Sequence, residues 1–201
     1  MPIRSLATAK SRLRTRSEVM RSQLALAFFA DTITALEHSI EVDRIVVVSR
    51  DAMVQALART RCDVVSDSET GLPAAVDLGI ERLRRVYHSG PVAVVLPDLP
   101  FATADAFDVL LSSARKYRQA FLADSSGTGS TCVTAASTEA MVHHFGPNSA
   151  TVHTEAGCAA LSVPVPGLRS DVDFLHDLRN RHSLRIGAHT DKVLNRWRMC
   201  L

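Results

Sequence analysis

The sequence predicts an α/β fold in which helices wrap a mostly parallel sheet. Short apolar runs rich in β-branched residues, such as RIVVVS at 44–49, have the composition of strands buried on both faces. These runs alternate with amphipathic segments at the intervals typical of βαβ units. The chain has 201 residues and no low-complexity linker, so we expect one domain over residues 1–201.

The individual elements follow from hydrophobic periodicity and from capping residues. The expected helices cover about 17–38, 51–59, 72–87, 103–117 and 171–181, and the expected strands cover 44–49, 62–66, 91–97, 119–123 and about 160–165. Asp51 and Thr103 supply side chains suited to capping two of these helices. The segment 131–136 is either a continuation of the strand at 119–123 or its partner, and 143–153 is expected to be a loop.

Composition excludes several classes of partner. A net charge of +2 and an aromatic content of 5% argue against a nucleic-acid partner. No run of eighteen apolar residues occurs, which argues against a membrane partner. The cysteines are widely spaced and form no CxxC pair, so we expect free thiols in a reducing cytoplasm: Cys62, Cys132, Cys158 and Cys200.

Acidic residues stand where two ligand-binding segments of the sheet are expected. Ligands of open α/β sheets bind beyond the carboxyl ends of the strands. Asp98, in LPDLP at 96–100, follows one strand and could hold Mg²⁺, or it could simply cap a helix. Asp171 and Asp173 offer the same two alternatives, one metal ligand with one cap or capping alone.

The stretch ADSSGTGST at 123–131 follows a second strand. Its glycines would let a ligand approach the backbone, and its hydroxyls would add donors for phosphate oxygens. A plain surface turn has the same composition. The segment therefore predicts either a turn or a phosphate cradle at the edge of the sheet that also carries Asp98.

The N-terminal segment is basic and has no acid before Glu18. Such a segment is typical of a transit peptide, of a solvated basic face or of a phosphate-binding strap. Lys10 and Arg12, two positions apart among small residues, are its candidate phosphate contacts. Two acidic sites, a Gly/Ser loop and a basic strap together are the parts of a nucleotidyl-transfer site.

The order of the motifs resembles one protein family. The chain carries PIRSLATAKSRL (2–13), VVVS (46–49), GL (71–72), LPDLP (96–100), DSSGTGS (124–130), FGPNS (145–149) and DVD (171–173). This order is similar to that of the guanylyltransferases of coenzyme F-420 biosynthesis. The resemblance implies a GT-A-like nucleotidyltransferase fold and transfer of GMP from GTP to the phosphate of a three-carbon acid, with Mg²⁺ as cofactor.

The resemblance also implies roles for particular residues. Asp98 and Asp171, with Asp173 beside them, would hold the metal, and Asp98, Lys10 and Arg12 would be catalytic, the two basic residues meeting the GTP phosphates. The acceptor would be bound by loop residues that match the family's motifs: Gly129, Ser130, Thr131, Gly146 and Ser149.

The resemblance favours phosphoenolpyruvate as the acceptor, with 2-phospho-L-lactate as the alternative. It leaves room for a partner transferase of the pathway and for a homodimer. Another GT-A-type enzyme that loads GMP onto a molybdopterin would carry an LxGGxSxRMGxxK segment, which is absent.

Two departures from the family pattern suggest a further alternative. The family begins with an apolar strand, which is expected to be missing ahead of Pro2, and Pro73 stands where an Asn usually contacts the nucleotide. A catalytically impaired nucleotide-binding paralogue is therefore the alternative to an active enzyme.

Overall fold

The computed structural model describes residues 1–15, 17–67, 71–87, 90–179 and 183–197. Cys200 lies outside these residues, and Cys62, Cys132 and Cys158 are free thiols. The helices are α1 (Glu18–His38), α2 (Ala52–Ala58), α3 (Leu72–Tyr87), α4 (Ala104–Ala114), α5 (Ser149–Glu155), α6 (Leu175–Arg179), α7 (Ala188–Arg196) and the 3₁₀ helix η1 (Pro166–Arg169). The strands are β1 (Val46–Val48), β2 (Asp63–Val65), β3 (Val92–Val95), β4 (Gln119–Ala123), β5 (Ser130–Ala135) and β6 (Ala159–Ala160).

The larger sheet has the strand order β3-β5-β4-β6. β5 pairs antiparallel with both β3 and β4, whereas β6 runs parallel to β4. The strands β3, β4 and β6 therefore point the same way and β5 alone is reversed. The sequence left 131–136 open, and the structure makes it the antiparallel partner of β4, across the loop that begins at Asp124.

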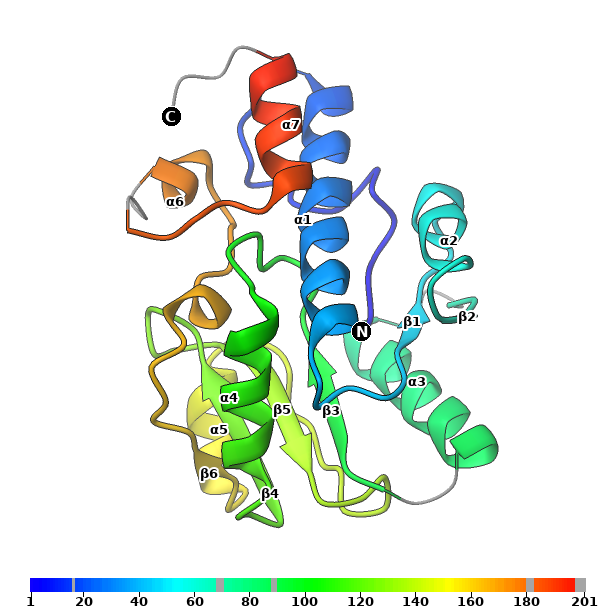
Figure 1. The fold of residues 1–201 in the computed structure, drawn as a ribbon, viewed down its shortest axis with the longest axis vertical. Helices are drawn as coiled ribbons and strands as arrows, with labels where there is room; N and C mark the ends of the chain where they lie inside the picture. The colour runs from blue at the N-terminus through cyan, green and yellow to red at the C-terminus, as the bar shows by residue number, and fades with distance from the viewer. Residues whose placement is uncertain (16, 68–70, 88–89, 180–182, 198–201) are drawn as a thin grey trace.

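Alternate side chains of this sheet enter two different cores, as the period of two along a strand requires. On one face Val95, Leu122 and Cys132 pack with residues of α1, α4 and η1. On the other face Phe121 and Val133 belong to a cluster that α3 and α5 complete. Figure 1 shows α4 in front of the sheet and α5 behind it. Burial on both faces explains the continuous apolar runs in the sequence.

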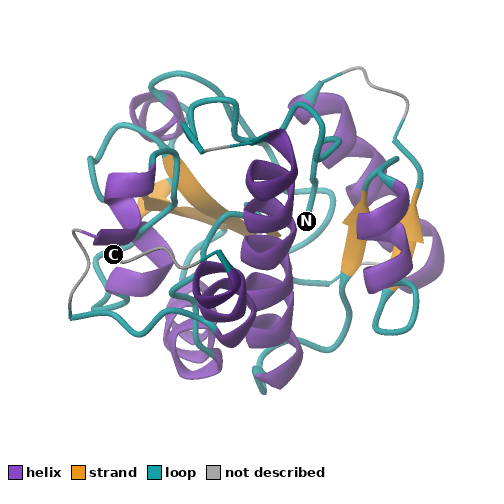
Figure 2. Ribbon diagram, turned by 90° about the horizontal axis from the view of Figure 1, so that it is seen from above, coloured by secondary structure: helices purple, strands orange, loops and turns teal. Residues whose placement is uncertain are grey.

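The smaller sheet consists of β1 and β2, which pair in parallel. Met1–Ile3 continue it on the other edge of β1, where Pro2 forms a parallel bridge with Val48 and Ile3 N donates to Val48 O at 2.9 Å. The two sheets stand apart with the N-terminus between them (Figure 2). A cavity of about 750 Å³ lies there, and Met1, Val46, Tyr87 and Val92 are among the residues that line it.

Most expected elements are confirmed, and the differences have local causes. Residues 149–153, expected in a loop, begin α5. Its N-cap Asn148 has a left-handed backbone and makes no side-chain capping bond, so the usual start signal is missing. The strand expected near 160–165 is reduced to the two residues of β6 and is followed by η1. The helix expected over 171–181 begins only at Leu175, as α6, and the end expected for it lies outside the described residues.

Helix α7 was not expected, because its start is capped from elsewhere in the fold. The buried carboxylate of Asp31 in α1 accepts hydrogen bonds from His189 N and Thr190 N at 2.9 Å and from Thr190 Oγ1 at 2.6 Å. α7 packs along α1, as Figure 1 shows. None of the described helices is both long and apolar enough to cross a membrane.

Candidate active site

The basic N-terminal segment at residues 2–13, called the strap from here on, is held in place by two charged side chains of the fold. Arg21, a buried residue of α1, donates to the backbone carbonyls of Leu6, Ala7 and Ala9. Asp51, which also caps α2, accepts a hydrogen bond from Leu6 N at 2.8 Å. A guanidinium satisfied by three carbonyls fixes a segment that has no regular structure of its own. The strap is therefore positioned before any ligand binds.

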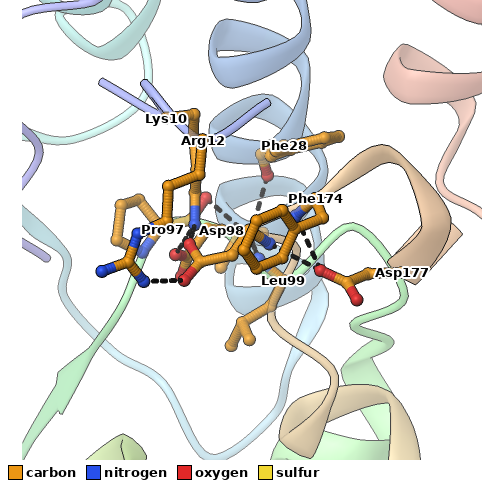
Figure 3. A network of polar contacts seen from close by, with 10 residues as sticks. Lys10, Arg12, Phe28, Pro97, Asp98, Leu99, Phe174 and Asp177 are labelled. Carbon is orange, nitrogen blue, oxygen red and sulfur yellow. Dashed lines mark hydrogen bonds and ion pairs between the residues drawn. The ribbon is translucent and has the colours of Figure 1, made fainter. Parts of the chain in front are cut away.

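Lys10 leaves the strap with a left-handed backbone (φ 54°) and points at two carboxylates. Its Nζ lies 2.5 Å from Asp98 Oδ2 (Figure 3). The same nitrogen lies 2.7 Å from Asp173 Oδ1. Asp98 follows β3, and its backbone carbonyl accepts from Val172 N at 3.2 Å, which ties the two acidic segments together. The strap, the end of β3 and the segment before α6 thus converge on one point.

Three carboxylates meet at this point. One oxygen from each of Asp98, Asp171 and Asp173 lies within 4.8 Å of the others. Asp98 Oδ1 is buried and has no hydrogen-bond partner among the described residues. A buried carboxylate oxygen without a donor is costly unless a cation satisfies it. The donor set is all oxygen and incomplete, which fits Mg²⁺, since that ion takes one or two carboxylates and completes its shell with water and phosphate.

The electrostatics of the cluster agree with this fit. Burial raises the pKa of Asp171 to about 7, and the negative charge of Asp98 adds to the effect while Lys10 opposes it. Burial would lower the pKa of Lys10, but the charges of Asp98 and Asp173 outweigh it, so that this pKa is raised. Burial would likewise raise the pKa of Asp173, yet Lys10 lowers it. A cation bound beside Asp171 would therefore stabilise its charged carboxylate.

The loop between β4 and β5 is shaped by Asp124. Its carboxylate accepts hydrogen bonds from Gly129 N at 2.9 Å, from Thr128 N at 3.1 Å and from Ser126 Oγ at 2.8 Å. A Cβ on Gly129 would lie 2.5 Å from Asp124 Oδ2, so the close approach requires glycine there. Gly127, at φ 75°, takes the left-handed turn. The conformation of this loop is therefore fixed by hydrogen bonds to the Asp124 carboxylate as well as by its glycines.

The loop before α5 lies against the loop of Asp124. Ala150 N, in the first turn of α5, donates to Thr128 O at 3.1 Å. The Asp124 loop is also tied to the acidic segment, because Ser125 N donates to Arg169 O at 2.7 Å. Gly129, Ser130, Gly146 and Ser149 therefore belong to two loops that are hydrogen-bonded to each other, with Ser130 and Ser149 buried between them and the helices and strands they join.

Two expected site residues lie differently from the rest. The hydroxyl of Thr131 is buried and donates to Leu168 O at 2.7 Å, which holds η1 against β5. Arg12 has a 70% exposed side chain and reaches Asp173 only at 3.4 Å. Three contributors were missed in the sequence: Arg21, Asp124 and His153, which contacts both loops. Arg21 and His153 act through tertiary contacts that no local motif announces, whereas Asp124 bonds residues two to five positions further on, as aspartates in turns commonly do.

Known proteins share both the sequence and the fold of this chain. A model of the family described as "Guanylyl transferase CofC like" matches residues 1–163. The chain is 40% identical over 194 residues to a protein named phosphoenolpyruvate guanylyltransferase 2 from Rhodococcus jostii, covering 96% of this chain and 88% of that protein. It is 35% identical over 198 residues to the phosphoenolpyruvate guanylyltransferase of Streptomyces scabiei, covering 94% and 92%.

A solved structure supports the same fold. A protein from Desulfovibrio desulfuricans G20, assigned as a nucleotide-diphospho-sugar transferase, superposes with a TM-score of 0.68 at 14% identity, covering 98% of this chain and 95% of that one. The GT-A-like expectation is thereby confirmed at the level of the fold. Family match and full-length similarity together place the chain: it belongs to the CofC-like guanylyl transferases, a family of nucleotidyltransferase enzymes.

Proposed function

We propose that the protein transfers GMP from GTP to the phosphate of phosphoenolpyruvate and releases pyrophosphate. One observation carries this proposal beyond family membership. Lys10 and three carboxylates converge at a point tied by backbone hydrogen bonds to the structured loop of Asp124. A carboxylate cluster that fits Mg²⁺, beside Lys10 and a structured glycine-rich loop, is what a triphosphate and a second anionic substrate need. The names of the relatives favour phosphoenolpyruvate as that second substrate.

The reaction needs positioning more than acid–base chemistry. A phosphate oxygen of the acceptor attacks the α-phosphorus of GTP in line, a new P–O bond forms, and the bond to the bridging oxygen of pyrophosphate breaks. The attacking oxygen is already anionic, so no proton has to be removed. Two anions must be brought together, and the charges of Lys10 and of the exposed Arg12 would reduce their repulsion.

Asp98, Asp171 and Asp173 would hold Mg²⁺. Bound there, the ion would neutralise charge on the triphosphate and on the leaving pyrophosphate. The orphaned Asp98 Oδ1 and the raised pKa of Asp171 support this assignment, because both groups gain from a nearby cation. Lys10, which pairs with Asp98 and Asp173 in the structure, would add its positive charge beside the GTP phosphates.

The two loops would bind the acceptor. Ser130, Gly146 and Ser149 match the family's acceptor contacts, and the hydrogen bond between Ala150 N and Thr128 O sets their loops side by side. Gly129 belongs to the same loop, whereas Thr131 would support it from behind through Leu168.

Pyrophosphate release tests the proposal. The purified chain is incubated with GTP and Mg²⁺ and with phosphoenolpyruvate, with 2-phospho-L-lactate or with no acceptor. Release that depends on phosphoenolpyruvate is expected. Pyrophosphate release that depends on 2-phospho-L-lactate alone would make that acid the acceptor in place of phosphoenolpyruvate. GTP binding without pyrophosphate release in the presence of either acid would identify a nucleotide-binding protein that lacks the activity.

A further inference from the structure

His153 joins the two loops assigned to the acceptor. It lies in α5 with none of its surface exposed, and its Nδ1 is 3.0 Å from Ser130 Oγ. Its Nε2 accepts a hydrogen bond from the backbone N–H of His144 at 2.9 Å. One imidazole therefore contacts the end of the Asp124 loop and the start of the FGPNS loop at the same time.

The contact with His144 fixes the tautomer of the ring. A backbone N–H can only donate, so Nε2 has to be the unprotonated nitrogen. In a neutral ring the proton then sits on Nδ1, which faces Ser130 Oγ, and the backbone of Ser149 is a second hydrogen-bond partner of the ring. A proton on Nε2 would instead place two donors face to face and abolish the bond to His144.

The surroundings of the ring keep it neutral. Burial lowers the pKa of His153 to about 4, and His144 and His143 act in the same direction, while a hydrogen bond with the backbone of Ser149 opposes them only in part. Phe121 and Phe145 pack against the ring, with ring centroids at 5.4 Å and 5.7 Å. A neutral, immobile imidazole with one fixed tautomer is the result.

The fixed tautomer determines what the Ser130 hydroxyl can do. Nδ1 carries the proton of the ring and cannot accept a hydrogen bond, so the hydrogen of the Ser130 hydroxyl has to be donated elsewhere. Within the described ranges, no protein group accepts that hydrogen. We infer that His153 is a positioning residue that turns the Ser130 hydroxyl into a dedicated donor for an anionic oxygen of the acceptor. This inference rests on the proposed function, since it names how the acceptor of that reaction is held.

The inference differs from a purely structural role for a buried histidine. A structural histidine would support both substrates equally through the stability of the fold. A histidine that orients Ser130 should matter for the acceptor alone, and only while the Ser130 hydroxyl is present. Because a hydrogen bond to a charged group in a largely buried site is strong, its loss should be measurable in acceptor binding.

Two isosteric variants separate the bonds of the ring. In His153→Asn the side-chain amide occupies the place of Nδ1 and can still donate to Ser130. In His153→Gln the amide oxygen occupies the place of Nε2 and can still accept from His144, but the donor to Ser130 is lost. We expect His153→Gln to raise the KM for phosphoenolpyruvate by about tenfold, with kcat and the KM for GTP changed less than about twofold. His153→Asn should retain most of the acceptor affinity of the wild type.

A double-mutant cycle gives the decisive comparison. In a Ser130→Ala background, His153→Gln should raise the KM for the acceptor less than about twofold further. Equal increases in the KM for both substrates, or an undiminished effect in the Ser130→Ala background, would overturn the inference. Nitrogen-15 NMR of the wild-type imidazole should show the Nδ1–H tautomer at pH 7, and the Nε2–H tautomer would overturn it as well.

Direct binding separates this inference from the proposed reaction. Calorimetry with phosphoenolpyruvate and no GTP measures acceptor affinity in the wild type and in His153→Gln. Binding that is weakened by His153→Gln, without pyrophosphate release from the wild type, would remove the proposed reaction and keep the inference. No binding of phosphoenolpyruvate by the wild type would overturn the inference itself.

Discussion

Lys10 and Asp98 stand 88 positions apart in the chain, and their side chains meet with Nζ 2.5 Å from Oδ2. The ion pair joins a strap without regular structure to the end of β3, an edge strand of the larger sheet. Lys10 also binds Asp173, so a single ammonium holds two of the three clustered carboxylates. The conformation of the site therefore depends on the positive charge of Lys10.

Asp98→Asn should abolish Mg²⁺-dependent turnover and leave the fold intact. The change keeps the shape of the side chain and removes one charged ligand of the ion, so kcat should fall by roughly 10³-fold or more. The free energy of unfolding without Mg²⁺ should change by less than about 1 kcal/mol, because Lys10 retains Asp173. Asp105→Asn, at an exposed position of α4, is the matched control, and unchanged turnover in Asp98→Asn would remove Asp98 from the metal site.

Lys10→Met should uncouple the strap from the carboxylates. Asp98 and Asp173 then lose their shared cation, and the free energy of unfolding without divalent ions should fall by about 2 kcal/mol. Added Mg²⁺ should recover part of this loss, because it supplies the missing charge to the same oxygens. Thermal unfolding with and without Mg²⁺ measures both effects. Lys116→Met, at an exposed position, should respond to neither, and a Lys10→Met loss that Mg²⁺ cannot reduce would speak against a shared site.

Gly129→Ala should weaken the acceptor loop. The new Cβ would lie 2.5 Å from Asp124 Oδ2 and would push the carboxylate away from the amides of Thr128 and Gly129. Loss of these charge-assisted bonds should raise the KM for the acceptor about tenfold, with a smaller change for GTP. Gly90→Ala is the control, since nothing lies within 4 Å of a Cβ at that position. Kinetics that match the wild type would show that the loop shape is not needed.

His153 should make stability depend on pH below neutrality. Its pKa is lowered from 6.5 to about 4, so between these values the unfolded chain binds a proton that the folded protein excludes. The contribution is fully present above about pH 6.5 and is lost as the pH falls toward 4, with a size on the order of 2–3 kcal/mol. Urea unfolding at pH 7.5 and pH 4.5 measures it.

The variant His153→Gln isolates this contribution, because glutamine does not titrate. The wild type should lose more stability than His153→Gln between the two pH values, whereas the exposed His189→Gln should behave as the wild type does. Equal losses of stability in the wild type and in His153→Gln would mean that the ring takes up its proton at the same pH in the folded and the unfolded state.

The sequence predicted those features that depend on neighbours along the chain. The buried runs Val46–Val48 and Gln119–Ala123 form strands because their composition suits burial on both faces, and Asp51 and Thr103 cap helices through residues two or three positions away. The topology of α/β folds predicted that Asp98 and the 124–131 loop share one edge of the sheet, and the resemblance added Asp171, a carboxylate oxygen of which lies within 4.8 Å of one from Asp98.

What the sequence did not predict depends on contacts between distant residues. Asp31 caps α7 across 158 positions, so no local pattern marks the start of that helix. Arg21 looks like an ordinary charged residue of an amphipathic helix, yet its guanidinium is enclosed by the strap that it holds. His153 is a single histidine in a short helix, and only the positions of Ser130 and His144 give it a role.

The separation of the two sheets has a consequence for local unfolding. No ladder hydrogen bond joins β1 to β3 among the described residues, and a cavity lies between them, so side-chain packing through helices such as α3 provides the cohesion. Cooperative units of a protein divide where such contacts are few. Amide hydrogens of Val46–Val48 should therefore exchange through a cheaper opening than those of Phe121 and Val133, and the two halves of the molecule should behave as separate foldons.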